Sequence, residues 1–345
     1  MDKQKRAILQ PNELSNDAVI SMRTRIISAL VGLAIVLPFV IFGDWPFFAL
    51  VSVVLVFAII EIIRCAKTKY SKTLYIVAFV LAFLILLWNI LQDFRNGNIN
   101  SAWRLFDSYN RITVSTTIMF IGICICAVTI LIDKNFTIID ACFIFTTVFL
   151  IALGFQCALF LRFFPVAQYH AGGMHSDLSY INAYDNLESC LLLVFVAVGA
   201  CLNDAFAYFV GVFFGKHKMN ERISPKKTWE GFFGGIILTG IVLIAWALIQ
   251  SIASNGEHAI LKGLLDHEHW WHVVVISHLI PLVSTLGDLV FSSIKRYYGI
   301  KDFSNILPGH GGILDRMDSL LFSFITVAIY VLIFTPGIGG GISLP

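Results

Sequence analysis

The chain has 345 residues, of which 58% are hydrophobic and only 13% are charged, and its mean hydropathy is +0.82. Soluble domains carry about 25% charged residues, so the composition excludes a soluble globular protein. The formal net charge of +2 is small. No nucleic-acid partner is expected, and the distribution of charge along the chain is more informative than its sum.

The apolar residues gather in nine runs, each long enough to cross roughly 30 Å of hydrocarbon as a helix. Residues 1–25 are polar, and no small-residue cleavage site follows the first run, so no signal peptide is expected. We predict an all-α polytopic membrane protein with a cytoplasmic N-terminus (1–25), helices 1–5 with outer loops (26–189) and helices 6–9 (190–345). The predicted spans lie near residues 26–43, 46–64, 74–91, 114–132, 138–161, 190–214, 231–254, 272–294 and 318–336.

The positive-inside rule tests the number and orientation of these spans. With the N-terminus in the cytoplasm, 19 of the 24 Lys and Arg residues fall in inner segments and 5 in outer segments, among them Arg162. A miscounted helix would scramble this alternation. The distribution therefore predicts nine spans with the C-terminus outside.

Three polar clusters fall on the predicted cytoplasmic side. The first is CLNDAFAYFVGVFFGKHK (201–218), which includes Asp204 within a span. The second is RISPKKTWEG (222–231), which opens the seventh span. The third runs from the end of the eighth span into the ninth, over residues 287–319.

The third cluster contains carboxylates whose spacing suits a metal. Asp288, Ser292 and Lys295 are spaced i, i+4, i+7 and share a helical face, while Asp315 and Asp318 share a face at i, i+3. An unpaired carboxylate within a span costs several kcal/mol, so Asp288 requires a cation. Three carboxylates at one membrane mouth favour Mg²⁺. Alternatively, Asp288 pairs with Lys295 or Arg296, and the other two aspartates merely favour a helix N-terminus.

Basic residues beside these acids suggest a ligand that carries phosphate groups. The hydroxyls of Ser224 and Thr228, together with the amides that open the seventh span, add neutral donors. Alternatively, the cations follow the positive-inside rule or contact anionic lipid. The cations in question are Lys226, Lys227, Lys295, Arg296, Lys301 and Arg316.

Residues 292–318, SSIKRYYGIKDFSNILPGHGGILDRMD, resemble the signature of the bacterial-type CDP-diacylglycerol synthases (phosphatidate cytidylyltransferases). Residues 213–231 and the N-terminal stretch RTRIISALVGLAIVLPFVIFGDWPF are also similar to that family. One departure is Phe206, which stands where the family has a small residue near Asp204. The fixed signature positions met here are Ser292, Lys295, Arg296, Lys301, Asp302, Ser304, Pro308, His310, Gly311, Gly312, Asp315, Arg316 and Asp318.

The resemblance implies transfer of the cytidylyl group of CTP to phosphatidic acid, which gives CDP-diacylglycerol and pyrophosphate for phospholipid biosynthesis. It implies catalytic roles for Lys295, Asp315 and Asp318; the spacing within the third cluster adds Asp288, with Mg²⁺ expected on the three aspartates and a second metal possible. The implied location is the bacterial inner membrane, with a cytoplasmic active site open to membrane lipid; a homodimer is compatible. The implied substrate-binding residues are Ser224, Lys226, Lys227, Thr228, Ser292, Arg296, Lys301, His310, Gly311, Gly312 and Arg316.

Two other classes of protein are alternatives. A cation-coupled transporter would use Asp140, Asp204 and Asp288 as an ion path, but such proteins show internal repeats and midplane sites. The sequence has no evident repeat, and its acids gather at one mouth. The CDP-alcohol phosphotransferases carry an aspartate-rich motif that this sequence lacks.

Overall fold

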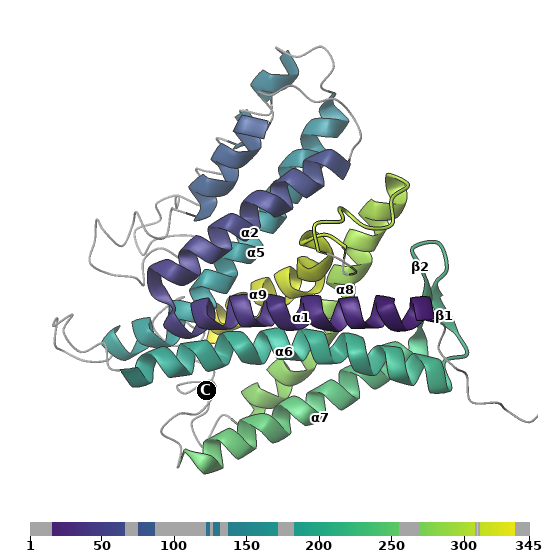
Figure 1. Ribbon diagram of the computed structural model, residues 1–345. Helices are drawn as coiled ribbons and strands as arrows, with labels where there is room; N and C mark the ends of the chain where they lie inside the picture. The colour runs from purple at the N-terminus through teal and green to yellow at the C-terminus, as the bar shows by residue number, and fades with distance from the viewer. Residues whose placement is uncertain are drawn as a thin grey trace, which may run out of the picture.

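The computed structural model describes residues 16–65, 75–86, 122–124, 127–131, 137–171, 183–254, 270–307, 309 and 311–334, most of which are helical. Helical residues also occur at 75–86, 122–124 and 127–131, in segments without labels in Figure 1. The labelled elements are α1 (Asn16–Phe42), α2 (Asp44–Cys65), α5 (Ile138–Ala171), α6 (Ala183–Phe214), β1 (Lys218–Asn220), β2 (Ser224–Thr228), α7 (Trp229–Ala253), α8 (Trp271–Tyr297) and α9 (Leu314–Phe334).

Among the described residues, five helices are long and apolar enough to cross a membrane. They are Trp45–Cys65, Ile138–Arg162, Cys190–Phe214, Trp229–Ala253 and Trp271–Tyr297, and each matches one predicted span. A mainly helical membrane protein is therefore confirmed. The number nine and the orientation of the termini stay predictions, and the spans expected at 74–91 and 114–132 lie partly outside the described residues.

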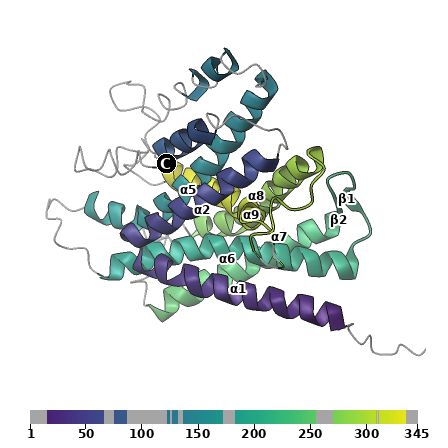
Figure 2. The same cartoon turned by 45° about the horizontal axis from the view of Figure 1, so that its top comes forward.

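The helices pack in two neighbouring sets that share α5. Along one side, α6 packs against α7 and α8 against α9, while α2 packs along α5. Figures 1 and 2 show α2 and α5 running alongside each other, and α5 contacts both α6 and α9. The core is filled by side chains from all these helices, such as Leu55, Phe155, Phe195 and Phe291, which are at most 2% exposed. The N-terminal helices thus reach the helices that carry the polar motifs.

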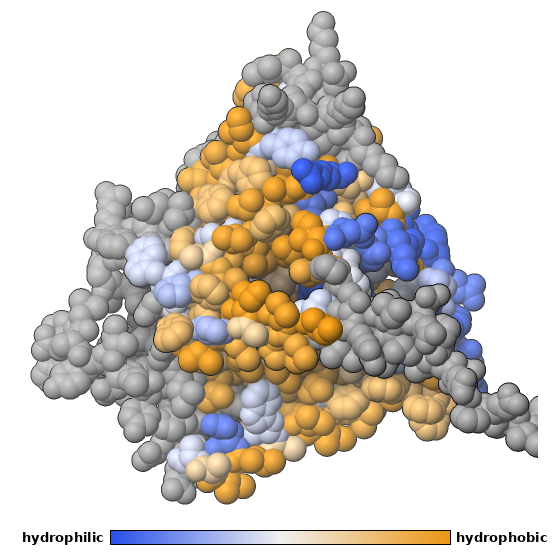
Figure 3. Space-filling model, viewed as in Figure 1, coloured by the Kyte–Doolittle hydropathy of each residue, from blue (hydrophilic) through white to orange (hydrophobic). Residues whose placement is uncertain are grey.

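Much of the described outer surface is apolar. Large apolar side chains are exposed on α1 (Val31) and on α7 (Leu248 and Ile252), as expected where lipid replaces water. Figure 3 shows hydrophilic side chains gathered on one side of the molecule, next to a wide apolar surface. The exposed polar residues of the hairpin and its flanks are Lys216, His217, Lys218, Glu221, Arg222 and Lys226.

The expectation of an all-α chain needs one correction. Residues 218–228 form an antiparallel hairpin in which Lys218 pairs with Thr228 and Asn220 with Ser224. The sequence suggested only a turn there, because a five-residue strand with Pro and two Lys lacks the usual strand pattern. A two-stranded ribbon exposes its edges, so the missing N–H of Pro225 is tolerated.

A second correction concerns Arg162. It was placed in an outer loop after a helix ending at 161, but α5 continues to Ala171 and Arg162 is only 1% exposed. Its Nε donates to the carbonyl of Val40 at 2.8 Å, and an Nη donates to that of Ile41 at 3.1 Å. These carbonyls belong to the last turn of α1 and have no acceptor role within that helix. Arg162 therefore caps α1 from a neighbouring helix.

Candidate active site

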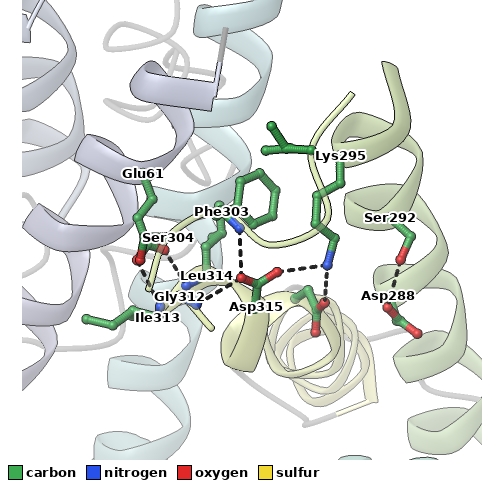
Figure 4. Close-up of polar contacts among 12 residues, drawn as sticks. Glu61, Asp288, Ser292, Lys295, Phe303, Ser304, Gly312, Ile313, Leu314 and Asp315 are labelled. Atoms are coloured by element: carbon green, nitrogen blue, oxygen red, sulfur yellow. Dashed lines mark hydrogen bonds and ion pairs between the residues drawn. The ribbon is translucent and has the colours of Figure 1, made fainter. Parts of the chain in front are cut away.

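The polar residues of the third cluster lie where α8 and α9 approach closely. A Cβ built on Gly287 would stand 2.6 Å from the carbonyl oxygen of Asp318, so only glycine permits this contact. The contact brings the face of α8 that carries Asp288, Ser292 and Lys295 against the first turns of α9 (Figure 4). Predicted site residues from two helices thus meet at one place.

Asp315 stands at the centre of a buried network. Its Oδ1 accepts from Lys295 Nζ at 2.8 Å, and its Oδ2 accepts from the backbone N–H of Phe303 at 2.8 Å and of Gly312 at 2.9 Å. The side chains of Lys295 and Asp315 are 10% and 5% exposed. This aspartate fixes the loop between α8 and α9 as well as the start of α9 (Figure 4).

Asp288 has different partners. It lies seven residues before Lys295 on α8, about two helical turns away. Its Oδ2 lies 2.6 Å from Nζ of Lys227 in β2, and its Oδ1 accepts from Ser292 Oγ at 3.1 Å. The Ser292 contact follows from the i, i+4 spacing. The cation partner is Lys227 rather than Lys295 or Arg296, so the hairpin and α8 are joined by this ion pair.

Asp318 and Asp204 add negative charge beside Asp288. Asp318 Oδ1 accepts from the backbone N–H of Ser319 at 2.7 Å, while its Oδ2 lies 4.0 Å from Lys295 Nζ, beyond hydrogen-bond distance. The carboxylates of Asp204, Asp288 and Asp318 repel one another, and Lys227 and Lys295 attract them. The cluster therefore carries acid groups that a divalent cation would stabilise.

The aspartates of this cluster suit Mg²⁺ as one or two ligands of an incomplete shell rather than as a full set of protein ligands. Within the described ranges, no three His, Cys, Asp or Glu side chains form a compact metal cage. Mg²⁺ is commonly held by one or two carboxylates and completes its shell with water and substrate phosphate oxygens. Asp318 fits that pattern most directly, and Asp288 fits it once Lys227 turns away from Oδ2, whereas both oxygens of Asp315 hold buried donors that fix the loop and the start of α9. Metal binding by the predicted trio stays a prediction.

The glycine pair of the motif shapes the turn before α9. Gly311 has a backbone φ of +85°, which residues with a side chain rarely adopt. It exchanges two backbone hydrogen bonds with Leu307, at 2.9 and 3.1 Å. A Cβ on Gly312 would meet the Glu61 carboxylate at 2.8 Å. Both glycines are therefore explained by the turn itself. His310, predicted to bind substrate, lies outside the described residues.

Other predicted substrate-binding residues divide into two groups. Thr228 is buried, and its Oγ1 caps α7 by accepting from the Gly231 N–H at 3.2 Å. Arg296 donates to the carbonyls of Ile223 at 3.3 Å and Ile300 at 3.2 Å, so it links the hairpin tip to the end of α8. The remaining members are at least partly exposed: Ser224, Lys226, Lys301 and Arg316.

The structure adds a residue that the motifs do not contain. Glu61, on α2, is 1% exposed and accepts from Ser304 Oγ and from the backbone N–H groups of Ile313 and Leu314. A signal was present in the sequence, because a lone carboxylate in the run FAIIEIIR must find partners. Its partners could not be named, since they lie more than 240 residues away.

Asp140, which the transporter alternative needs, is placed at the start of α5. Its Oδ2 accepts from the Thr137 N–H at 3.1 Å and from the Thr137 hydroxyl at 2.6 Å, and its own N–H donates to that hydroxyl at 3.3 Å. This reciprocal pattern stabilises a helix N-terminus. The structure therefore accounts for Asp140 without an ion path.

Comparison with known proteins agrees with the motif. Residues 23–334 match the model of the Cytidylyltransferase family. The chain belongs to this family. It is 29% identical to the phosphatidate cytidylyltransferase of Bacillus subtilis strain 168 over 304 aligned residues. The aligned region covers 88% of this chain and 95% of the relative. The Haemophilus influenzae phosphatidate cytidylyltransferase is 30% identical over 300 residues, with 87% and 94% covered.

The match extends well beyond the signature. The phosphatidate cytidylyltransferase of Staphylococcus aureus strain COL is 27% identical over 301 residues, with 87% of this chain and 95% of the relative covered. Because the family model begins at residue 23, it includes α2 and Glu61 as well as the C-terminal helices. The resemblance drawn from residues 292–318 is thereby confirmed at the level of the family.

Proposed function

We propose that the protein is a phosphatidate cytidylyltransferase, which transfers the cytidylyl group of CTP to phosphatidic acid for phospholipid biosynthesis. One observation carries the proposal: residues 292–318, which resemble the family signature, form a single cluster with Lys227 and Asp288, in which Lys295 and Asp318 take part. The family match over residues 23–334 supports the same activity. A membrane location suits a reaction that has one lipid substrate and one water-soluble substrate.

The reaction is a substitution at the α-phosphorus of CTP. An oxygen of the lipid phosphate forms a bond to that phosphorus while the bond to the α,β-bridging oxygen breaks, and pyrophosphate leaves. A phosphate monoester is already anionic at neutral pH, so no strong general base is needed. The protein must instead position two anions and neutralise their charge.

The chain supplies groups for both tasks. Asp288 and Asp318 would hold Mg²⁺, which when bound neutralises charge on the CTP phosphates. Lys227, on the hairpin, lies beside Asp288 of α8. Its ammonium group can turn to a phosphate oxygen without leaving the site. Asp315 and Lys295 hold the loop and α9 in register, so that Asp318 faces α8.

We place the site on the cytoplasmic side of the membrane, open sideways to the inner leaflet. CTP cannot cross a bilayer, and the 19 inner basic residues include those of the hairpin and of residues 295–316. Single-cysteine labelling in cells, with native cysteines removed, tests this orientation. A cysteine at exposed Asn305 should react with impermeant maleimide only after lysis, and one at Asn255 should react in intact cells. The reverse pattern would refute the orientation.

The activity itself has a direct test. Purified protein should convert labelled CTP and phosphatidic acid into a labelled lipid in the presence of Mg²⁺, with one pyrophosphate released per lipid formed. Chelation of Mg²⁺ should stop the reaction, and added Mg²⁺ should restore it. If no labelled lipid forms although the protein is folded in detergent, the proposed function is wrong.

A further inference from the structure

We propose that Glu61 is a positioning residue for cytidylyl transfer, which sets the place of the first turn of α9 and thereby of Asp315 and Asp318. The proposal rests on the proposed function for its kinetic part only. Glu61 belongs to α2, in the N-terminal half of the chain, and lies outside the signature segment. It is nevertheless in direct contact with that segment (Figure 4).

Three donors converge on this one carboxylate. Oε1 accepts from Ser304 Oγ at 2.5 Å and from the Ile313 N–H at 2.9 Å, and Oε2 accepts from the Leu314 N–H at 2.7 Å. Charge-assisted bonds of this kind are shorter and about twice as strong as neutral ones. Glu61 thus binds the loop and the helix start together.

The bonds of Glu61 interlock with those of Asp315. Three consecutive backbone N–H groups take part. That of Gly312 donates to Asp315, and those of Ile313 and Leu314 donate to Glu61. These groups precede and begin α9, where amides lack partners within the helix and negative charge is favoured. Two carboxylates from separate parts of the chain therefore fix one turn. Displacement of Glu61 would also displace Asp315.

The requirement is for a carboxylate of this length. An amide at position 61 would keep one acceptor oxygen but would present an NH₂ group to one of the two backbone donors. Gly312 leaves only enough room for the present arrangement, since even a Cβ there would stand 2.8 Å from either Glu61 oxygen. Glu61→Gln therefore preserves volume and removes the pattern of acceptors.

A purely structural role would give a different result. If Glu61 only stabilised the packing of α2, its loss would lower the melting temperature and leave turnover normal in the protein that stays folded. Val51 provides the matched control, because it is 5% exposed on the same helix. It lies ten residues from Glu61 in sequence, about 15 Å along the helix axis. Val51→Ala creates a cavity without touching the α9 turn.

The experiment compares Glu61→Gln with Val51→Ala in detergent, well below their melting temperatures. We expect Glu61→Gln to lower kcat by about 10- to 100-fold, with the KM for CTP changed less than about threefold, because small misplacement of reacting groups carries costs of this size. Val51→Ala should keep kcat within about twofold, since it leaves the reacting groups in place. Equal kcat values for the two variants would overturn the proposal.

Amide hydrogen exchange gives a reading that needs no activity. The Ile313 and Leu314 amides should be protected in the wild-type protein and should exchange at least about tenfold faster in Glu61→Gln, because exchange reports local opening. Unchanged protection in that variant would overturn the proposal even if the wild-type enzyme proved inactive on CTP. Conversely, faster exchange with no lipid product from the wild type would leave the contact established and refute only the function.

Ser304→Ala keeps the test usable if Glu61→Gln does not fold. It removes one donor to Glu61 and leaves the two backbone bonds intact. We expect a smaller fall in kcat, about threefold, at an unchanged melting temperature, because only part of the positioning is lost. Normal turnover in a folded Ser304→Ala protein would refute the role.

Discussion

The site contains two lysine–aspartate ion pairs of similar length that differ in their burial and in the elements that they join. Lys227 and Asp288 lie 2.6 Å apart, with side chains 23% and 25% exposed, and they join a hairpin to a helix. Lys295 and Asp315 lie 2.8 Å apart, with side chains only 10% and 5% exposed, and backbone N–H groups occupy the other Asp315 oxygen. The first pair is open to a ligand, and the second is enclosed by the fold.

This difference suggests a division of labour. The Lys227–Asp288 pair is only partly buried, so it contributes less than a fully buried pair, and an arriving charged substrate can compensate each partner as the two separate. Removing one partner of a buried pair costs about 3–5 kcal/mol, because the other charge is left without compensation. Lys295 and Asp315 are therefore suited to holding the site in shape.

The largest effect is expected for Asp315→Asn. The amide removes the charge that compensates Lys295 and places an NH₂ group near existing donors, so both the fold and the chemistry should suffer. We expect a loss of stability of about 3–5 kcal/mol and a fall in turnover of at least about 10²-fold. Thermal unfolding in detergent and product formation at low temperature measure the two effects. A fully stable variant would show that the buried pair is not structural.

Asp288→Asn should separate activity from stability. Because this pair is about a quarter exposed, its loss should cost less stability than the ~3–5 kcal/mol of the buried pair. Turnover should still fall about 10²-fold, since a strong electrostatic contact to the reacting phosphates would be lost. Activity measured against Mg²⁺ concentration should show a raised requirement. Normal Mg²⁺ dependence would remove Asp288 from the proposed metal site.

Neighbouring lysines on β2 provide an internal comparison. Successive residues of a strand face opposite sides, and Lys227 points to Asp288 while Lys226 is exposed. The sequence predicted that both act on nucleotide phosphate, and the structure favours Lys227. We expect Lys227→Gln to raise the KM for CTP about tenfold, the size of one charge-assisted contact, and Lys226→Gln to change it less than about threefold. Equal effects would restore the original prediction for both residues.

The sequence predicted the parts of the site that depend on local spacing. The i, i+4 relation between Asp288 and Ser292 appears as a hydrogen bond, and Asp315 and Asp318 begin a helix as expected. The demand that a carboxylate within a span must find a cation was also met. These features follow from helix geometry and from the cost of burying charge, which are both readable from a single chain.

The sequence did not identify partners that the tertiary fold supplies. Lys295 was expected to face Asp288, seven residues away, but it bonds Asp315 across the α8–α9 contact. Glu61 and Arg162 both serve the ends of other helices, and their partners are more than 100 residues away. Helix-end capping by a distant side chain leaves no spacing pattern, because either helix could pack against many others.

The smallest effect is expected at Arg296, which supports the open pair from outside. Its guanidinium donates to the Ile223 carbonyl at 3.3 Å and the Ile300 carbonyl at 3.2 Å, so it steadies the hairpin that presents Lys227. We expect Arg296→Gln to raise the KM for CTP about threefold, a shift of well under 1.4 kcal/mol, with kcat unchanged. Arg222→Gln, an exposed cation on the same hairpin, is the control and should behave as wild type. A loss of kcat as large as that of Asp288→Asn would instead place Arg296 on the substrate, as the sequence motif first suggested. Such a result would extend the open half of the site beyond the Lys227–Asp288 pair to the end of α8.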